Sequence, residues 1–518
     1  MAAAATPPTL AAEPLPAHPW LITIAVMLGT FMEVLDTSVA NVALPHIAGS
    51  LAASLDESTW VLTSYLVSNA IVLPATGWLG RRFGRKNFLL FCIALFTFAS
   101  FLCGAATSLT TLIAARILQG VGGGALQPIA QAILLESFPV AKRGQAMAAY
   151  AFGIVCAPII GPTLGGWITD NYSWRWVFYI NIPVGLLAIY MVWALIHDPA
   201  HIRNAKRTGI DYWGFGLMAL WLGTLQLVLD RGQQEDWFGA VRIRWLTAIC
   251  IASFLGFVAR ELLAREPLVN LRILSNRNFA LGTAVVTIIG VVLYGTTALI
   301  PEFLQGLMGY TAYRSGLTVS PRGIGSVVAI LLVGKLLGKV DGRYLITIAM
   351  VLLGWSSWML GHVSLQTASS SIVIPVVMNG AAISLLFVPL SVLTTSTLKV
   401  EEMGAATGLY NLMRNIGGSV GISMVTTMLA RQSQTHQAVL AAHVTPYDPA
   451  TQQRLASLTQ HMLPQEAIGV LYGQVVQQAT LWGFVSNFRW MAILSFGCIV
   501  LAFVFKKVRT GGNPLEVH

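Results

Sequence analysis

Long apolar segments recur along the whole chain, separated by short polar or Gly/Pro-rich breaks. A helix needs about 20 apolar residues to cross a hydrocarbon core of roughly 30 Å, and about fourteen segments meet that length. The strands of membrane barrels are shorter and alternate in polarity, so the pattern predicts an all-α membrane protein. Helices are expected near residues 21–44, 58–79, 87–107, 110–135, 144–168, 177–196, 211–229, 244–263, 279–304, 314–337, 344–361, 370–395, 405–430 and 487–506.

Composition agrees with this class. Hydrophobic residues make up 55% of the chain and charged residues 10%, unlike a soluble globular domain. Lys and Arg gather in alternate loops, which the positive-inside rule places in the cytoplasm together with both termini. This rule explains the net charge of +10, so no nucleic-acid partner is expected. The five cysteines fall within predicted spans without ligand spacing, and no disulfide, metal site or cofactor is expected.

A faint internal repeat suggests two related halves. "GWLGRRFGRKNFLL" at 77–90 and "GKLLGKVDGRYLIT" at 334–347 both place a basic Gly-Arg loop between two spans. The expected organisation is a disordered cytoplasmic tail (1–19), an N-terminal six-helix bundle (20–200), an inserted two-helix linker (201–275), a C-terminal six-helix bundle (276–510) with a periplasmic loop at 431–482, and a cytoplasmic tail (511–518). Within that loop, Asp448 with Pro449, and Pro464, are predicted helix starts.

Two acids stand inside the first apolar segment, "FMEVLDTSVANVALP". Glu33 and Asp36 share one helix face, and a charge at the membrane centre costs about 2.5–3.5 kcal/mol. Such groups must face a cavity or a partner, and a sheltered carboxyl can exchange protons at physiological pH. Asp36, with Glu33 and the isolated Arg116, is therefore a candidate proton-coupling group. The alternatives are a static ion pair between helices and, for Glu33, contact with substrate.

Other polar side chains in apolar segments are candidates for lining a substrate cavity. The second half has two isolated arginines in its apolar segments, Arg322 and Arg414. Only Arg414 is counted among the candidate cavity residues. The candidate cavity residues are Glu33, Asn41, Gln119, Gln127, Asn411 and Arg414.

Two glycine-rich stretches point to close helix packing. In "GIVCAPIIGPTLGGW", small residues recur every four positions and two prolines remove backbone donors, which suits a bent helix at a moving interface, although ordinary packing explains the pattern too. The basic stretch "GWLGRRFGRK" permits a tight reversal, or simply fixes topology. The residues concerned are Gly77, Gly80, Arg81, Gly84, Arg85, Gly153, Pro158, Gly161, Pro162, Gly165 and Gly166.

The sequence gives little support for an enzyme. No G-x-x-x-x-G-K-[ST] stretch is present, so ATP is not the expected energy source, and no H-E-x-x-H occurs. The pattern G-x-S-x-G occurs once, as GGSVG at 417–421, but inside an apolar segment predicted to span the membrane and not at a strand-to-helix turn. No catalytic residue is assigned.

Several of these stretches resemble the Major Facilitator Superfamily, and within it the fourteen-helix, EmrB-like drug:proton antiporters. "FMEVLDTSVANVALP" is similar to that branch's first-helix motif, "RILQG" to its fourth-helix motif, "GPTLGGW" to the antiporter motif of helix five and "WRWVFYINIPVG" to the start of helix six. One departure stands out: Gly80 occupies a position where the family usually carries Asp, so a charged latch between the halves is not assumed here.

The resemblance implies proton-driven efflux of hydrophobic or amphipathic drugs from the bilayer of a bacterial inner membrane, with Asp36 protonated and Arg116 modulating it. It also implies a periplasmic adaptor of the EmrA kind and an outer-membrane channel, which the loop at 431–482 could contact, unless that loop is only a solvated spacer.

Two rival functions remain at this stage. A proton-coupled uptake symporter of the same fold would carry the same residues. A membrane enzyme acting on lipid intermediates would use Asp36 and Glu33 as acid and base.

Overall fold

The computed structural model of the chain describes residues 18–53, 55–139, 142–198, 211–264, 267–336, 340–399 and 402–505. Nearly all of these residues are helical, which confirms the all-α class. The helices of the first half are α1 (Pro19–Ser50), α2 (Leu55–Ser58), α3 (Trp60–Val72), α4 (Thr76–Phe83), α5 (Arg85–Ala105), α6 (Leu109–Gly123), α7 (Leu126–Ser137), α8 (Arg143–Asn171), α9 (Trp176–Tyr179) and α10 (Asn181–Leu195).

An inserted pair and a second half follow. The inserted helices are α12 (Tyr212–Arg231) and α13 (Val241–Leu263). The helices of the second half are α14 (Arg277–Glu302), α15 (Ala312–Val319), α16 (Arg322–Leu336), α17 (Gly342–Leu360), α18 (Ser369–Thr395), α19 (Met403–His443), α20 (Pro449–Thr459), α21 (Pro464–Gly497) and α22 (Ile499–Val504). Short turns of 3-10 or π helix join some of them, at Leu73–Ala75, Trp237–Gly239, Leu271–Ser275 and Phe303–Leu307.

Twelve helical segments among the described residues are long and apolar enough to cross a membrane. Two more run alongside them. The 3-10 turn containing Pro74 divides α3 from α4, since proline lacks the amide that would continue the helix. The other segment, α19, is long enough but more polar. The predicted fourteen spans are therefore compatible with the structure.

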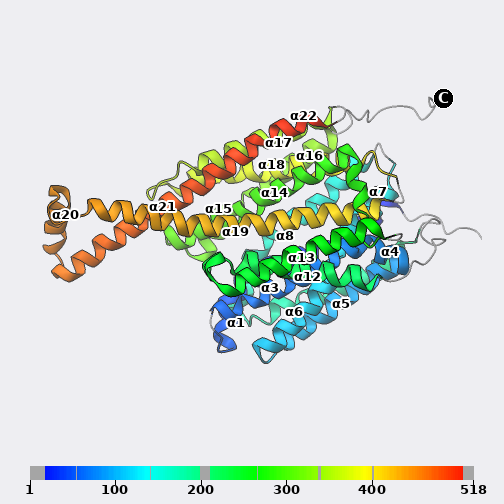
Figure 1. Cartoon of the computed structure of the whole chain (residues 1–518), viewed down its shortest axis with the longest axis horizontal. Coiled ribbons are helices and arrows are strands. Elements are labelled where there is room, and N and C mark those ends of the chain that lie inside the picture. Colours follow the sequence, from blue (N-terminus) through cyan, green and yellow to red (C-terminus); the bar gives the residue numbers. More distant parts are fainter. Residues whose placement is uncertain are drawn as a thin grey trace, which may run out of the picture.

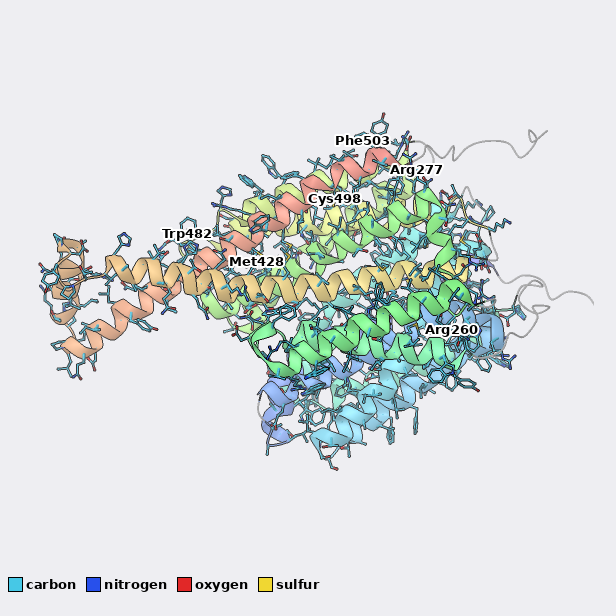
Figure 2. All side chains as sticks on the ribbon, in the orientation of Figure 1. Arg260, Arg277, Met428, Trp482, Cys498 and Phe503 are labelled. Carbon is cyan, nitrogen blue, oxygen red and sulfur yellow. The ribbon has the colours of Figure 1, made fainter. Side chains whose placement is uncertain are left out.

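The bundle has two distinct ends. Helices start or finish with arginines at one of them, including Arg85, Arg143 and Arg277, and we call this the basic end. Figure 2 shows Arg260 and Arg277 near the basic end, with Trp482 toward the opposite end. Arginines also occur at the opposite end, where α12 ends at Arg231 and α13 carries Arg242 and Arg244 in its first turn, so the cations are in excess at the basic end, as the positive-inside rule describes, and not confined to it.

A helical hairpin projects from the end opposite the basic one (Figure 1). It consists of the last part of α19, α20 and the first part of α21. Helix starts at Asp448–Pro449 and at Pro464 are confirmed. The predicted boundaries at 430 and 487 are wrong, because both flanking helices continue beyond their apolar segments. Residues 431–443 are rich in Ala and Gln, good helix formers that extend α19 into a polar environment.

The cap of α20 supports a prediction. The Thr451 hydroxyl and backbone N–H both donate to Asp448, at 2.8 and 2.9 Å, and they lower the pKa of that carboxyl. A lowered pKa contributes stability at neutral pH, and this contribution is lost as the pH falls below the ordinary carboxyl value of about 4. Asp448→Ala should therefore accelerate hydrogen–deuterium exchange in the first turn of α20 at neutral pH. Ser457→Ala in the same helix is the control, and equal exchange in both variants would contradict the assignment.

The inserted helix α12 lies between the two halves (Figure 1) and is bonded to both of them. Asp230 accepts a hydrogen bond of 2.7 Å from the Thr63 hydroxyl of α3. One turn earlier on α12, Gln226 accepts one of 2.8 Å from the Ser419 hydroxyl of α19. The insertion is thus part of the packed bundle.

Candidate functional site

Asp36 lies at the centre of a buried polar cluster. Its side chain is fully buried on α1. Three donors from two other helices surround the carboxylate: Arg116 Nη1 at 2.6 Å, Gln119 Nε2 at 2.9 Å and Asn181 Nδ2 at 2.8 Å. The first two come from α6 and the third from α10. A charged acid in such a place depends on full pairing, and the cluster supplies it.

Arg116 is equally buried and is held from several sides. Its Nε donates to the Val61 carbonyl at 2.9 Å, and Nη1 also donates to Gln119 Oε1 at 2.7 Å. The guanidinium carbon lies 4.3 Å from the centre of the Tyr65 ring, a cation–π contact. Removing one partner of a buried ion pair costs about 3–5 kcal/mol, so a change of charge at Asp36 must be felt by Arg116.

Sequence reasoning missed two members of this cluster. The Ser100 hydroxyl, on α5, accepts from Gln119 at 2.7 Å and from Asn181 at 3.2 Å. Asn181 could have been recognised as a candidate site residue, because it is a lone amide inside the apolar stretch "WRWVFYINIPVG". Ser100 carried none, since serine satisfies itself within membrane helices by bonding to its own backbone.

Glu33 faces a different set of partners. Its carboxylate accepts from Asn69 Nδ2 of α3 at 3.2 Å and from Gln127 Nε2 of α7 at 3.0 Å. The side chain is buried, and within the described part of the chain no lysine or arginine forms an ion pair with it. The two acids on one face of α1 are thus held by separate groups: Asp36 by a cation and amides, Glu33 by amides alone.

The Gln127 side chain connects Glu33 to the second half of the molecule. Its Oε1 accepts from Arg414 of α19, while its Nε2 donates to Glu33. Further along the same seam, Asn411 donates to Gln131 at 2.9 Å and the Thr407 hydroxyl to the Pro128 carbonyl at 3.2 Å. Three turns of α19 therefore bond to α7 across the boundary between the halves.

The predicted cavity residues divide into three groups. Glu33, Gln127, Asn411 and Arg414 meet at the seam between α7 and α19. Gln119 belongs to the Asp36 cluster. Asn41 joins neither group, since its exposed side chain donates to the Thr37 carbonyl of its own helix.

At the basic end, the halves touch backbone to backbone. A Cβ atom on Gly77 of α4 would lie 2.7 Å from the Ala405 nitrogen and 2.8 Å from the Gly404 carbonyl carbon. Only glycine permits this approach of α4 to α19, and the bundle is closed here. Gly80, one turn later, would place its Cβ 3.4 Å from the Arg85 side chain, so its surroundings are looser.

The predicted basic loop is mostly helical. Gly77, Gly80 and Arg81 lie on α4, and the reversal is made at Gly84, whose φ of +83° favours glycine. Arg85 begins α5 and forms an ion pair with Glu136, a buried acid that sequence reasoning missed. Both residues belong to the first half, so this pair does not replace the family's latch between the halves.

The small-residue stripe of α8 packs within the first half. Cβ atoms on Gly153, Gly161 and Gly165 would meet Met27, Ser38 and Val39 of α1 at 2.4–2.8 Å. The stripe therefore fixes α8 against the helix that carries both acids. The predicted close packing is thus made against α1, in the same half, and a role of the stripe at a moving interface stays a prediction. Pro158 and Pro162 lie inside the continuous α8, and Gly166 lies near Val42.

Comparisons with known proteins agree with the sequence motifs. The family model described as Major Facilitator Superfamily matches residues 26–422. The chain is 36% identical to the multidrug export protein EmrB of Haemophilus influenzae over 491 residues, 94% of this chain and 95% of that protein. The fatty acid resistance protein FarB of Neisseria gonorrhoeae is 36% identical over 491 residues, 94% of this chain and 96% of FarB.

A solved structure supports the fold alone. The human organic anion transporter MFSD10 superposes with a TM-score of 0.64 at 11% identity, covering 95% of this chain and 100% of that one. The resemblance inferred from the motifs is thus confirmed, and the chain belongs to the Major Facilitator Superfamily.

Proposed function

We propose that this protein is a proton-driven efflux transporter that exports hydrophobic or amphipathic compounds by alternating access. The observation that carries the proposal is the Asp36 cluster, a fully buried acid that can neither stay charged without its donors nor change charge without disturbing them. The names of the relatives EmrB and FarB, multidrug export and fatty acid resistance, support this substrate range.

The coupling follows from the cost of leaving Arg116 unpaired. A proton on Asp36 removes the counter-charge of Arg116, which keeps neutral partners: the Val61 carbonyl, Gln119 and the rings of Tyr65 and Phe178. Breaking a buried pair costs about 3–5 kcal/mol. Moving a two-state equilibrium from 1:99 to 99:1 takes about 5.5 kcal/mol. One proton at this site is therefore of the right size to redistribute inward-open and outward-open states.

The link to the second half passes through Glu33 and Gln127. Asp36 and Glu33 are one turn apart on α1, so a shift of this helix moves both. Gln127 holds Glu33 with its amide nitrogen and Arg414 with its amide oxygen. Movement of α1 thereby weakens the seam between α7 and α19, which must part before the basic end can open.

The proposed location is the bacterial inner membrane, with the basic end and both termini in the cytoplasm. The arginines at the basic end, among them Arg260 and Arg277 in Figure 2, and the bacterial relatives support this orientation. The hairpin at 431–482 then lies in the periplasm, where an adaptor protein leading to an outer-membrane channel would dock.

Everted membrane vesicles provide the test. With acid inside, vesicles containing the protein should accumulate a lipophilic fluorescent dye, and collapse of the proton gradient should release it. Vesicles without the protein are the control. Gradient-driven dye movement in the opposite direction would indicate an uptake symporter, and a covalently changed substrate in mass spectrometry would indicate an enzyme.

A further inference from the structure

Arg322 is a cation deep in the second half. It is the first residue of α16 and follows the break at Pro321 between α15 and α16. Helix α15 begins at Ala312, and α16 ends at Leu336, near the basic end. At 1.5 Å per residue, Arg322 lies about 15 Å from one end of this span and about 21 Å from the other, near the middle of the membrane.

The side chain of Arg322 is on the inward face of α16. Successive residues turn by about 100°, so positions 322, 326, 329 and 333 share one face. Ser326, Ala329 and Val333 are all buried there. The opposite face carries Ile324, Val328 and Leu331, which are more than half exposed and suited to lipid. The guanidinium therefore points into the protein.

Within the described part of the chain, this guanidinium bonds to one neutral side chain. Nη1 donates to the Thr297 hydroxyl of α14 at 3.0 Å. Among the described residues, no acidic side chain forms an ion pair with Arg322, whereas Arg85, Arg116 and Arg343 each have one. Glu302 is an acid on the same helix as Thr297, but it lies five residues further along α14, about 7.5 Å along the helix axis, and forms no ion pair with Arg322.

Arg322 also lies beside the boundary between the halves. Helices α15 and α16 run along α8 of the first half: Cβ atoms on Gly316 and Gly334 would lie 3.9 Å from Thr163 and Ala148. Thr297 is exposed, so space remains next to the guanidinium. Arg322 is thus a half-buried cation near the membrane centre, at this boundary, with no counter-charge among the described residues, and such a cation is suited to bind an anion.

We propose that Arg322, assisted by Thr297, binds the anionic head group of amphipathic substrates, in particular a carboxylate, during export. The inference rests on the proposed function and narrows its substrate class. A guanidinium offers a planar pair of N–H donors that matches a carboxylate. The Thr297 hydroxyl donates to the Leu293 carbonyl and accepts from Arg322 Nη1, so it holds the guanidinium in position. The apolar remainder of the substrate would then lie among the surrounding helices. The depth of Arg322 argues against a lipid phosphate, which stays at the membrane surface.

The test uses two probes that differ only in head group: 11-(dansylamino)undecanoic acid and its primary amide. Their binding to the purified full-length protein in nanodiscs of phosphatidylcholine alone is followed by dansyl fluorescence. Arg322→Gln should raise the Kd of the carboxylate at least about tenfold and leave that of the amide unchanged. Arg322→Lys should lie between wild type and Arg322→Gln, because lysine keeps the charge but not the planar fork. Arg314→Gln removes an exposed arginine of α15 and is the matched control.

Several outcomes would overturn the inference. Equal losses for carboxylate and amide would make Arg322 a packing residue. Tight carboxylate binding by Arg322→Gln would place the anion elsewhere. The measurement is repeated in nanodiscs that contain anionic phosphatidylglycerol. If binding of the carboxylate probe is lost only in those nanodiscs, the site would be assigned to lipid. Efflux of a cationic dye by the wild type, without binding of the carboxylate probe, would reject the inference and keep the proposed function, whereas absence of all gradient-driven transport would reject both.

Discussion

Asp36→Asn is expected to abolish gradient-driven efflux while substrate exchange without a gradient continues. Asparagine keeps the shape of the side chain and cannot take up a proton, so the transporter loses the event that redistributes its states. Gln119 and Asn181 still lie close enough to bond to the amide oxygen. The measurement is dye transport in proteoliposomes, with and without a proton gradient, and the pH dependence of dye binding should disappear in the variant.

A second variant separates loss of coupling from loss of fold. Asp36→Asn leaves Arg116 charged and unpaired, at a cost of about 3–5 kcal/mol. The double change Asp36→Asn with Arg116→Gln removes both charges and should restore thermal stability without restoring coupling. Gradient-driven efflux retained by either variant would show that the proton binds elsewhere, with Glu33 as the next group to test.

Gly77→Ala is expected to stop transport by preventing closure of the basic end. The added methyl group would stand 2.7 Å from the Ala405 nitrogen and 2.8 Å from the Gly404 carbonyl carbon, and these are backbone atoms that cannot rotate away. Overpacking of this kind costs about 1–3 kcal/mol, which shifts a two-state equilibrium roughly 5- to 150-fold. The states in which α4 and α19 separate escape this cost, so they should become dominant.

Spin labels report the shift directly. Phe83 and Lys399 are exposed at the basic end, one in each half. Spin labels on a double cysteine variant at these positions allow the distance between them to be measured by electron paramagnetic resonance. Gly77→Ala should lengthen the distance. Gly80→Ala, one turn away on the same helix, adds the same methyl group at 3.4 Å from the Arg85 side chain, an ordinary van der Waals distance, and should leave both distance and transport near wild type. Similar behaviour of the two variants would contradict the role of the Gly77 contact.

The sequence predicted the fold and the principal charges of the site, because both depend on the cost of polarity in lipid. Apolar length placed most of the spans, and Asp36 and Arg116 stood out as isolated charges in apolar segments. The pairing with Asn181 and Ser100 was not predictable, since an amide or hydroxyl in a membrane helix often bonds locally. For α8, spacing predicted a close contact but could not say that the neighbour is α1.

Hydropathy also failed at the hairpin, for a physical reason. Hydropathy identifies the residues that lie within the bilayer, whereas the length of a helix depends on backbone hydrogen bonding and residue propensity. Beyond position 430 the composition turns polar, yet α19 continues to His443, and α21 begins well before its apolar part. A helix that leaves the membrane is indistinguishable from a loop when only apolarity is counted.

The contacts of α12 make the two flanks of the molecule unequal. On this flank the halves are tied through one helix, by Asp230 with Thr63 and by Gln226 with Ser419, only a turn apart. On the other flank α8 and α16 meet directly, and no described helix is inserted between them. The two halves should therefore rotate about an axis near α12 and separate most on the α8–α16 side. A compound dissolved in the lipid would then find its way in or out through that side.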